Sequence, residues 1–426
     1  MENIIIIIFV VGYLAIALEH LIKINKAATA LLTGVLCWTA YSLFSSDQHL
    51  VEFQLVEHLG EITGILFFLL GAMTIVELID SHDGFNIITR KITQKNKRSL
   101  LIIISIITFF LSAILDNLTT TIVMVSLLRK LIKEPEDRLF FAGMIVIAAN
   151  AGGAWSPIGD VTTTMLWIGG QITAKEIIIS LILPSLICLA APLIYLSFKL
   201  KGKVTTPDQK VVNGNSTLSP KQQMIVLLSG VVVLILVPVF KTVTHLPPFM
   251  GILLGLGVLW IITEILHGDK DEAEKGILSV THALRKIDTP SILFFLGILV
   301  SISALQSIGS LANAATWMTA NLKNESLIIM SIGLLSAIVD NVPIVAAVQG
   351  MYDLNQYPTD HFFWKFLAYC SGTGGSALII GSAAGVAAMG MEKISFFWYL
   401  RKISLLALIG YFAGALTYLL QYQILS

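Results

Sequence analysis

Two aspartates stand beside asparagines inside long apolar runs. Asp116-Asn117 interrupts LSAILDNLTTTIVM, and Asp340-Asn341 interrupts the similar run LSAIVDNVPIV. At the centre of a bilayer an aspartate costs roughly 2.5–3.5 kcal/mol on insertion scales, so such a residue usually faces a hydrated or protein-lined interior. Carboxylate and amide oxygens suit small hard cations. Because a carboxylate in a medium of low dielectric also takes up protons readily, a cation and a proton would compete for it. That competition is the minimum chemistry of cation/proton exchange.

A second polar stretch, NAGGAWSPIGDVTT, covers residues 150–163. Its Gly-Gly and Ser-Pro pairs predict a helix that is broken at membrane depth, where irregular backbone is tolerated if it lines a cavity or is packed in protein. A related stretch, SGTGGSALIIGS, covers residues 371–382 and has hydroxyls but no carboxylate, because Ser382 stands in the place of Asp160. We therefore expect one cavity that contains three carboxylates.

The candidate side chains for cation and proton binding all carry oxygen and all lie in these four stretches. They are Asp116, Asn117, Asn150, Asp160, Thr162, Thr163, Asp340 and Asn341, with Ser156, Thr119, Ser371, Thr373 and Ser376 as secondary candidates. Na⁺ or Li⁺ is the expected ion, and no cofactor is expected. A structural reading stays open for each residue, since Asp and Asn are good helix N-caps and a membrane threonine ordinarily bonds its own helix. Recurrence of the Asp-Asn pair favours function.

Three further titratable residues, Glu77, Asp80 and His82, end the third apolar segment. Their ordinary interpretation is that they are solvated at the cytoplasmic interface. The sharper hypothesis is that they give protons access to the site or sense pH.

The elements that must position these residues are membrane helices. Of 426 residues, 56% are hydrophobic and 13% are charged, whereas soluble proteins carry about 25% charged residues. Many apolar runs reach the roughly 18 residues that a transmembrane helix needs. The composition predicts an all-α polytopic membrane protein that contacts a lipid bilayer. The net charge of zero gives no reason to expect a nucleic-acid partner.

Charge patterning predicts the topology, because cytoplasmic loops are enriched in Lys and Arg. Basic residues flank both ends of segment 99–128, so it is predicted to be a re-entrant hairpin with Asp116-Asn117 at its tip. Segment 326–350 lacks arginines on its flanks and is predicted to enter from the opposite side. About ten spanning helices, two re-entrant hairpins and two broken helices follow, with both termini outside. Two ordinary helices with imperfect charge bias remain the alternative.

Similar blocks recur in the same order in the two halves, and opposed charge patterns make them inverted repeats, an arrangement typical of secondary transporters with a midplane site. The division is residues 1–59 as N-terminal scaffold helices, 60–200 as repeat one with a broken helix over 139–170, 201–287 as linker and connecting helices, and 288–426 as repeat two with a broken helix over 361–391.

Three stretches carry a resemblance to a known family. GAMTIVELIDSH at 71–82, DNLTTT at 116–121 and NAGGAWSPIGDVTT at 150–163 resemble the NhaD family of Na⁺(Li⁺)/H⁺ antiporters, which is distantly related to arsenite permeases and dicarboxylate carriers. The resemblance implies cation exchange through the matched residues, a pH-dependent role at His82, a homodimer and elevator-like movement.

These observations together predict a secondary active antiporter that exchanges Na⁺ or Li⁺ for H⁺ across a bacterial plasma membrane. The alternative is an anion or metalloid permease of the arsenite or dicarboxylate type on the same scaffold. An enzyme is not expected, because the chain has no His-Glu-x-x-His, Gly-x-Ser-x-Gly or phosphate-loop motif.

Overall fold

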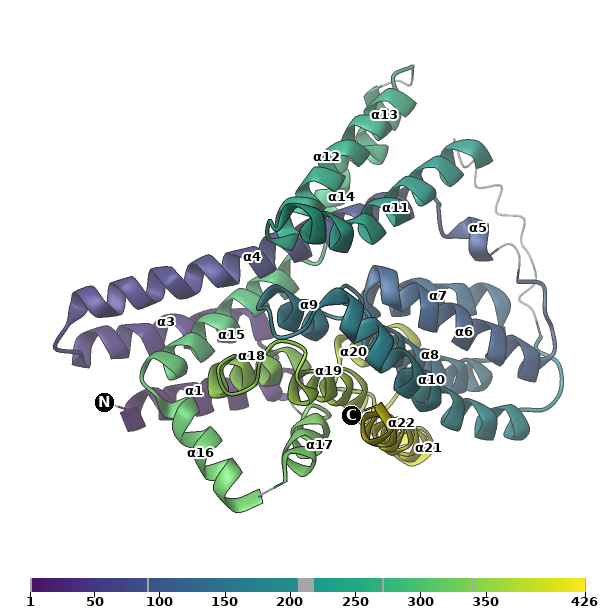
Figure 1. The fold of residues 1–426 in the computed structure, drawn as a ribbon. Helices are drawn as coiled ribbons and strands as arrows, with labels where there is room; N and C mark the ends of the chain where they lie inside the picture. The colour runs from purple at the N-terminus through teal and green to yellow at the C-terminus, as the bar shows by residue number, and fades with distance from the viewer. Residues whose placement is uncertain are drawn as a thin grey trace.

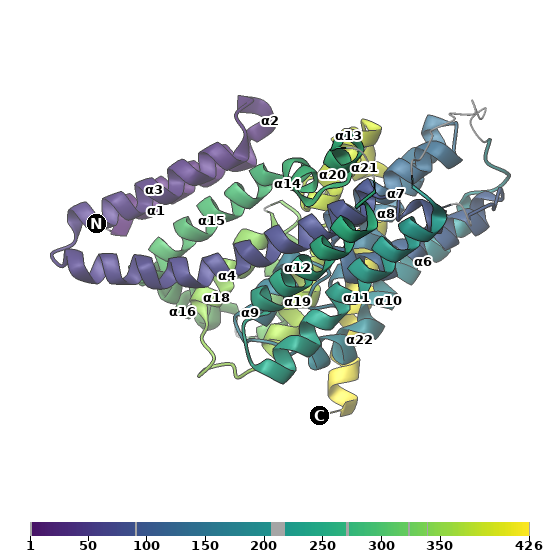
Figure 2. The same cartoon turned by 90° about the horizontal axis from the view of Figure 1, so that it is seen from above.

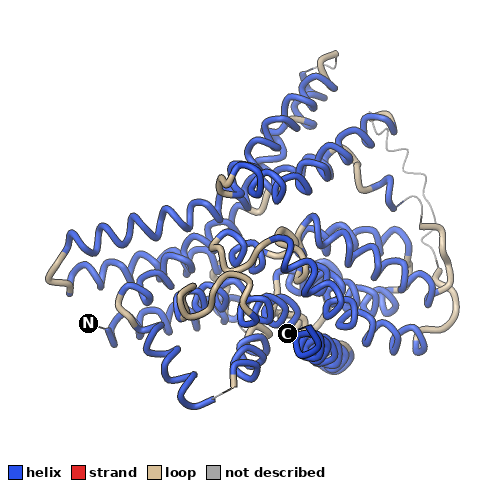
Figure 3. The backbone as a smooth tube through the Cα atoms, viewed as in Figure 1, coloured by secondary structure: helices blue, strands red, loops and turns tan. Residues whose placement is uncertain are grey.

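The computed structural model describes residues 2–89, 92–205, 218–269, 272–322, 324–338 and 340–425. Within these ranges the regular secondary structure is helical, and strand pairing is limited to one isolated bridge between Asn96 and Lys203 (Figures 1 and 3). Residues 206–217 and 270–271, both within the predicted linker and connecting helices at 201–287, lie outside the described residues.

The N-terminal helices are α1 (Glu2–Ala17), α2 (Glu19–Ile22), α3 (Lys26–Phe44), α4 (Gln48–Ser81) and the short α5 (Asn86–Thr89). α1 packs on α3, and α15 lies between α3 and α4 and packs on both (Figure 2). α4 begins at Gln48, so it starts within the predicted N-terminal scaffold, residues 1–59, and continues into predicted repeat one. Asp47 caps the longer helix, since its carboxylate accepts a hydrogen bond from the Leu50 amide at 3.0 Å.

The first Asp-Asn segment forms a helical hairpin. α6 (Lys97–Leu115) and α7 (Asn117–Leu131) reverse at Asp116. Both outer ends contact the same short segment, because the Lys97 amide donates to Gly202 and the amide of Lys133 donates to Thr205, at 3.0 and 2.8 Å. The chain continues through α8 (Pro135–Gly153), α9 (Val161–Ile168) and α10 (Ala174–Lys199). The reversal is as predicted, whereas the depth at which the hairpin sits in a bilayer remains a prediction.

Two connecting helices project from the body of the molecule in Figure 1. They are α11 (Pro220–Thr244) and α12 (Pro248–Leu266), which pack on each other and on α4 and lead into α13 (Glu272–Leu278) and α14 (Val280–Lys286). The second half comprises α15 (Thr289–Ser307), α16 (Ser310–Leu322), α17 (Glu325–Leu335), α18 (Asn341–Met351), α19 (Phe362–Gly374), α20 (Ala383–Glu392), α21 (Phe396–Lys402) and α22 (Ser404–Leu425). The helices α13, α14 and α16 lie in stretches for which no helix was predicted.

Non-helical backbone separates α8 from α9 and α19 from α20, at residues 154–160 and 375–382, in agreement with the two predicted broken helices. Each broken helix packs closely on its hairpin, and the contacts correspond. A Cβ on Gly152 would lie 2.1 Å from the carbonyl oxygen of Phe109, and one on Gly374 would lie 2.0 Å from that of Gly333.

Matching hydrogen bonds reinforce this correspondence between the halves. The Ser112 hydroxyl donates to the Ala149 carbonyl at 2.6 Å, and the Ser336 hydroxyl donates to the Ser371 carbonyl at 3.2 Å. The packing of a broken helix against the first helix of its Asp-Asn segment therefore occurs twice, as α8 on α6 and α19 on α17. The second re-entrant hairpin and the opposite orientation of the two units in a membrane remain predictions.

Eight helices in the described ranges are long and apolar enough to cross a membrane, namely α3, α4, α6, α10, α11, α12, α15 and α22. The protein is a multi-pass membrane protein. The predicted total of about ten spans is not settled by helix length, because α6 belongs to a hairpin and α1, at 16 residues, is shorter than a usual span.

Candidate functional site

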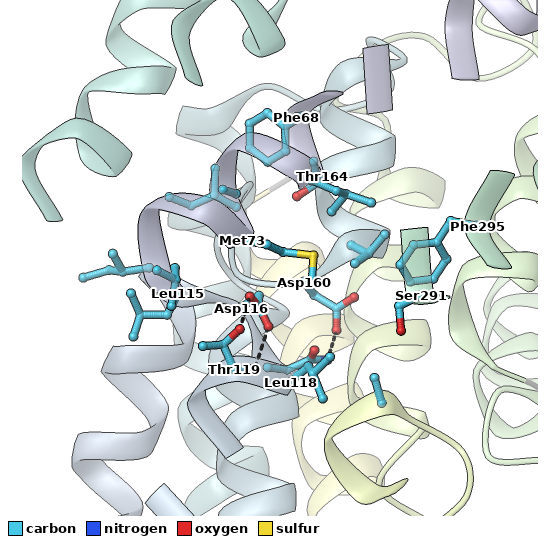
Figure 4. A pocket seen from close by; sticks show the side chains of 18 of the residues that line it. Phe68, Met73, Leu115, Asp116, Leu118, Thr119, Asp160, Thr164, Ser291 and Phe295 are labelled. Carbon is cyan, nitrogen blue, oxygen red and sulfur yellow. Dashed lines mark hydrogen bonds between the residues drawn. The ribbon is translucent and has the colours of Figure 1, made fainter. Parts of the chain in front are cut away.

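The three aspartates line one cavity of about 60 Å³ near the middle of the molecule. Asp116 comes from the tip of the first hairpin, Asp160 from the break between α8 and α9, and Asp340 from the turn between α17 and α18, the predicted tip of the second hairpin. Figure 4 shows Asp116, Thr119 and Asp160 around this pocket, below Phe68 and Met73 of α4. The tertiary fold thus brings Asp340 beside Asp116, although the two carboxylates are more than 200 residues apart in the sequence.

Asp160 is the most extensively bonded of the three carboxylates. It is the N-cap of α9, and its Oδ1 accepts from the backbone amide and the hydroxyl of Thr162, at 2.9 and 2.8 Å. Both hairpin asparagines also donate to it: Asn117 at 2.5 Å and Asn341 at 3.4 Å to each oxygen. The side chain is buried, so these donors compensate the cost of removing a carboxylate from water.

Asn150 connects the first broken helix to the second. Its carbonyl oxygen accepts from the Asn117 amide at 3.1 Å, and its own amide donates to the hydroxyls of Ser376 and Ser382, both at 2.9 Å. The absence of a carboxylate at Ser382 has a physical consequence, because a neutral hydroxyl there can accept from Asn150 without adding a second buried negative charge beside Asp160. Ser382 was not among the predicted site residues, although it was predicted to stand in the place of Asp160.

Asp116 occupies an unusual backbone conformation, with φ of 85° and ψ of 160°. Its Oδ1 accepts from the Thr119 amide and its Oδ2 from the Thr119 hydroxyl, both at 2.8 Å. It therefore caps α7, which is the structural reading left open by the sequence, and it lines the cavity as well. The two readings hold together here, because one oxygen can cap a helix while the carboxylate faces the cavity.

Asp340 has a partner that sequence reasoning missed. Its Oδ2 lies 3.3 Å from the ammonium of Lys26, at the start of α3, and its Oδ1 accepts weakly from the Val342 amide at 3.4 Å. By the enrichment of cytoplasmic loops in Lys and Arg, Lys26 would be counted as an ordinary loop residue. No local signal distinguishes it from Lys23, and only the fold places its side chain in the cavity.

The remaining hydroxyl candidates mostly bond backbone carbonyls. Ser156 donates to Ala113, Thr163 to Asp160, Ser371 to Leu367 and Thr373 to Tyr369. Three of these bonds, those of Thr163, Ser371 and Thr373, are local to a helix or its cap, as expected for hydroxyls in apolar surroundings. These side chains hold the broken helices and the first hairpin in place, and none of the four borders the cavity.

The C-terminal end of α4 carries Glu77 and Asp80, and His82 caps it. All three residues lie outside the central cavity. Glu77 pairs with Lys286 at 3.4 Å, and Asp80 lines a separate pocket of about 270 Å³ with Asp83 and Lys130. His82 is buried rather than solvated: its Nδ1 lies 2.7 Å from the Leu78 carbonyl oxygen and its Nε2 lies 2.9 Å from Nε2 of His267. The expectation that His82 is solvated is therefore wrong, whereas its place at the cytoplasmic interface stays a prediction.

Comparison with known proteins identifies the family of the chain. A family model described as "CitMHS: Citrate transporter" matches residues 7–364. The chain belongs to this family. Sodium/proton antiporter 1 of Arabidopsis thaliana is 50% identical over 413 residues, which are 97% of this chain and 71% of that protein. Sodium/proton antiporter 2 of the same plant is 48% identical, covering 97% of this chain and 98% of that protein.

The CitMHS relatives also confirm the resemblance found in the sequence. The Na⁺/H⁺ antiporter NhaD of Vibrio cholerae is 31% identical over 443 residues, covering 97% of this chain and 90% of that protein. NhaD of Vibrio parahaemolyticus is 31% identical over 417 residues. The similarity to NhaD therefore extends over nearly the whole chain, beyond the three stretches that first indicated it, and the family and these relatives are transporters.

Proposed function

We propose that the protein is a secondary active antiporter that exchanges Na⁺ or Li⁺ for H⁺ by alternating access. The observation that carries the proposal is the convergence on Asp160. Asn117 and Asn341, from two separate hairpin tips, both donate to this one carboxylate. A cation that binds Asp160 takes over oxygens now held by amide donors, so ion binding and the positions of both hairpin tips are coupled.

The composition of the cavity favours a small cation over an organic anion. Three aspartates line a volume of about 60 Å³, and one water molecule needs roughly 10–15 Å³ on this measure. The cavity thus suits an ion with a few waters. A citrate would face carboxylates of its own sign, and like charges at short distance repel strongly. The relatives named as sodium/proton antiporters support the same choice.

The chemical cycle needs groups that accept either a proton or a cation. The carboxylates of Asp116, Asp160 and Asp340 supply this choice, and the amide oxygens of Asn117, Asn150 and Asn341 supply neutral ligands. Proton binding neutralises a carboxylate and releases the cation, and loss of the proton on the other side restores the site. Inward proton flow then drives cation efflux.

We further propose the finer points that the sequence predicted: a bacterial plasma membrane location, both termini outside, Li⁺ as a second substrate and a homodimer. Glu77 and Asp80 would give protons access from the neighbouring pocket, and His82 would respond to pH. The transporter activity does not depend on these details.

Proteoliposomes that contain an internal pH dye test the proposal. Na⁺, Li⁺, K⁺, arsenite and citrate are added in turn to wild type and to Asp116→Asn, Asp160→Asn and Asp340→Asn, with the exposed loop variant Asp353→Asn as the matched control. We expect Na⁺ or Li⁺ to move protons in wild type and the control. Each site variant should lose at least about 100-fold in rate, since an exchanging carboxylate cannot be replaced by an amide. Citrate or arsenite uptake without cation-coupled proton movement would refute the proposal.

A further inference from the structure

The cavity contains a built-in positive charge. Among the described residues that line it, Lys26 is the basic side chain, opposite three aspartates. Its ammonium lies 3.3 Å from Oδ2 of Asp340, and the two side chains are 28% and 18% exposed. The pair is therefore largely shielded from solvent, where a charge interaction is stronger than at a surface.

The ammonium also lies over an aromatic face. Its Nζ is 4.3 Å from the centroid of the Phe294 ring on α15, within the range of a cation–π interaction. Lys26 thus has two favourable partners on different elements: a carboxylate at a hairpin tip and a ring on a neighbouring helix. A sodium ion at Asp340 would compete with the first partner and leave the second intact.

Lys26 is held by the N-terminal scaffold. It is the first residue of α3, where Asn25 caps the Ala27 amide at 2.8 Å and the Lys26 amide donates to Glu19 at 3.2 Å. α3 is in close backbone contact with α15, because a Cβ on Gly297 would lie 2.4 Å from the carbonyl carbon of Ala30. The base of the lysine therefore has a fixed position relative to α15.

From this arrangement we propose that Lys26 is a tethered competitor of the transported cation. Its ammonium neutralises Asp340 while the site is empty, and Na⁺ must displace it to use that carboxylate. Lys26 thereby sets the apparent Na⁺ affinity, and its release frees the tip of the second hairpin from the scaffold. The inference rests on the proposed exchange function and extends it to a residue outside the predicted site.

The test compares Lys26→Gln, which removes the charge, with Lys26→Arg, which keeps it. Half-saturating Na⁺ is measured from proton flux in proteoliposomes and, independently, from Na⁺-dependent thermal stabilisation of the purified full-length protein. We expect half-saturation to fall about tenfold in Lys26→Gln, since an opposite charge at this distance changes cation binding to a carboxylate by about one order of magnitude or more. Lys26→Arg should stay closer to wild type.

A double variant separates competition at Asp340 from general structural damage. In the Asp340→Asn background, Lys26→Gln should leave Na⁺-dependent stabilisation unchanged, because the carboxylate for which both cations compete is gone. Lys26→Met, which keeps an apolar stem against Phe294, gives a second neutral variant if Lys26→Gln folds poorly.

The outcomes are distinct. Unchanged or weaker Na⁺ affinity in the folded neutral variants would overturn the inference, as would a shift that persists without Asp340. Either result, with wild-type exchange intact, would leave the proposed function standing. Wild type that moves no protons in response to Na⁺ or Li⁺ would refute the proposed function itself, and the inference with it.

Discussion

Asp116 shows how one residue can serve both fold and site. Its φ of 85° with ψ of 160° lies in a region that is essentially reserved for glycine and costs other residues about 1–3 kcal/mol. The residue persists there because Thr119 bonds both carboxylate oxygens and because α6 and α7 are fixed at their outer ends. Strain of this kind is typical of functional sites, where the side chain is needed despite the backbone.

A comparison of Asp116→Gly with Asp116→Ala tests this interpretation. Both variants should lose exchange, because both lose the carboxylate. The glycine variant should nevertheless be the more stable by about 1–3 kcal/mol, since only glycine relieves the strained backbone. Thermal unfolding in detergent measures the difference. Equal melting temperatures would show that the conformation carries no strain.

At the scale of the elements, the close contact between each Asp-Asn segment and its broken helix determines the geometry of the site. Gly152 and Gly374 face backbone carbonyls at distances that leave no room for a methyl group. Because the partner atoms are backbone, the neighbour cannot move aside by changing a rotamer. These contacts hold each hairpin tip against the break that carries Asp160 or Ser382, so they determine where the polar tips lie.

Alanine at either glycine should therefore separate a hairpin from its broken helix. We expect Gly152→Ala and Gly374→Ala each to destabilise the protein by about 1–3 kcal/mol or more and to reduce exchange together with stability. Gly390→Ala in α20 is the matched control, since a Cβ there meets nothing within 4 Å and alanine favours a helix. The measurement is the melting temperature with proton flux on the same preparations. A Gly152→Ala protein as stable as the control would contradict the packing argument.

In the molecule as a whole, the two halves are joined by a buried ionic clamp as well as by the site. The Glu392 carboxylate, at the end of α20, is 3% exposed and accepts from Nε of Arg129 at 2.7 Å and from Nε of Arg138 at 2.8 Å. These arginines end α7 and begin α8. The clamp therefore connects the first hairpin and first broken helix to the second broken helix, at a distance from the cavity.

Loss of the clamp carboxylate should weaken this connection. Glu392→Gln is expected to lower stability by on the order of 2–3 kcal/mol, since hydrogen bonds to charged groups contribute about 1.5–3 kcal/mol and the arginines are partly exposed. Glu176→Gln is the control, because its pair with Lys365 is 3.6 Å long and its side chain is 38% exposed, where ion pairs contribute about 0–1 kcal/mol. Chemical or thermal unfolding measures the loss of stability in both variants. An equal loss would show that burial does not strengthen the Glu392 interactions.

The proposed inverted arrangement of the halves makes a prediction about sidedness. Lys133 follows the first hairpin and Asn355 follows the predicted second hairpin, and both residues are exposed. Each is replaced by cysteine in turn. In intact cells a membrane-impermeant maleimide should label Asn355→Cys, and Lys133→Cys only after permeabilisation. The native cysteines Cys37, Cys188 and Cys370 are 0–3% exposed and give little background. Labelling of both positions from one side would contradict inverted repeats.

The features that depend on local chemistry could be predicted from the sequence. A carboxylate in an apolar run, a Gly-Gly or Ser-Pro break and a long hydrophobic stretch each have a cost or a preference that is set within a few residues. The broken helices, the reversal at Asp116 and the polar residues around Asp160 were therefore predictable. The N-terminal half of α4, the helix α16 and the burial of His82 were not, because neighbouring helices override weak local signals there.

Which polar groups meet, in contrast, depends on how the helices pack. The ammonium of Lys26 reaches Asp340 across more than 300 residues, Asn150 joins Ser376 and Ser382 of the other half, and Glu392 gathers two arginines from the first. A buried polar group must find a partner, but the sequence does not say which one. That choice depends on how whole helices pack, because close backbone contacts at a few glycines determine the distances between elements far apart in the chain.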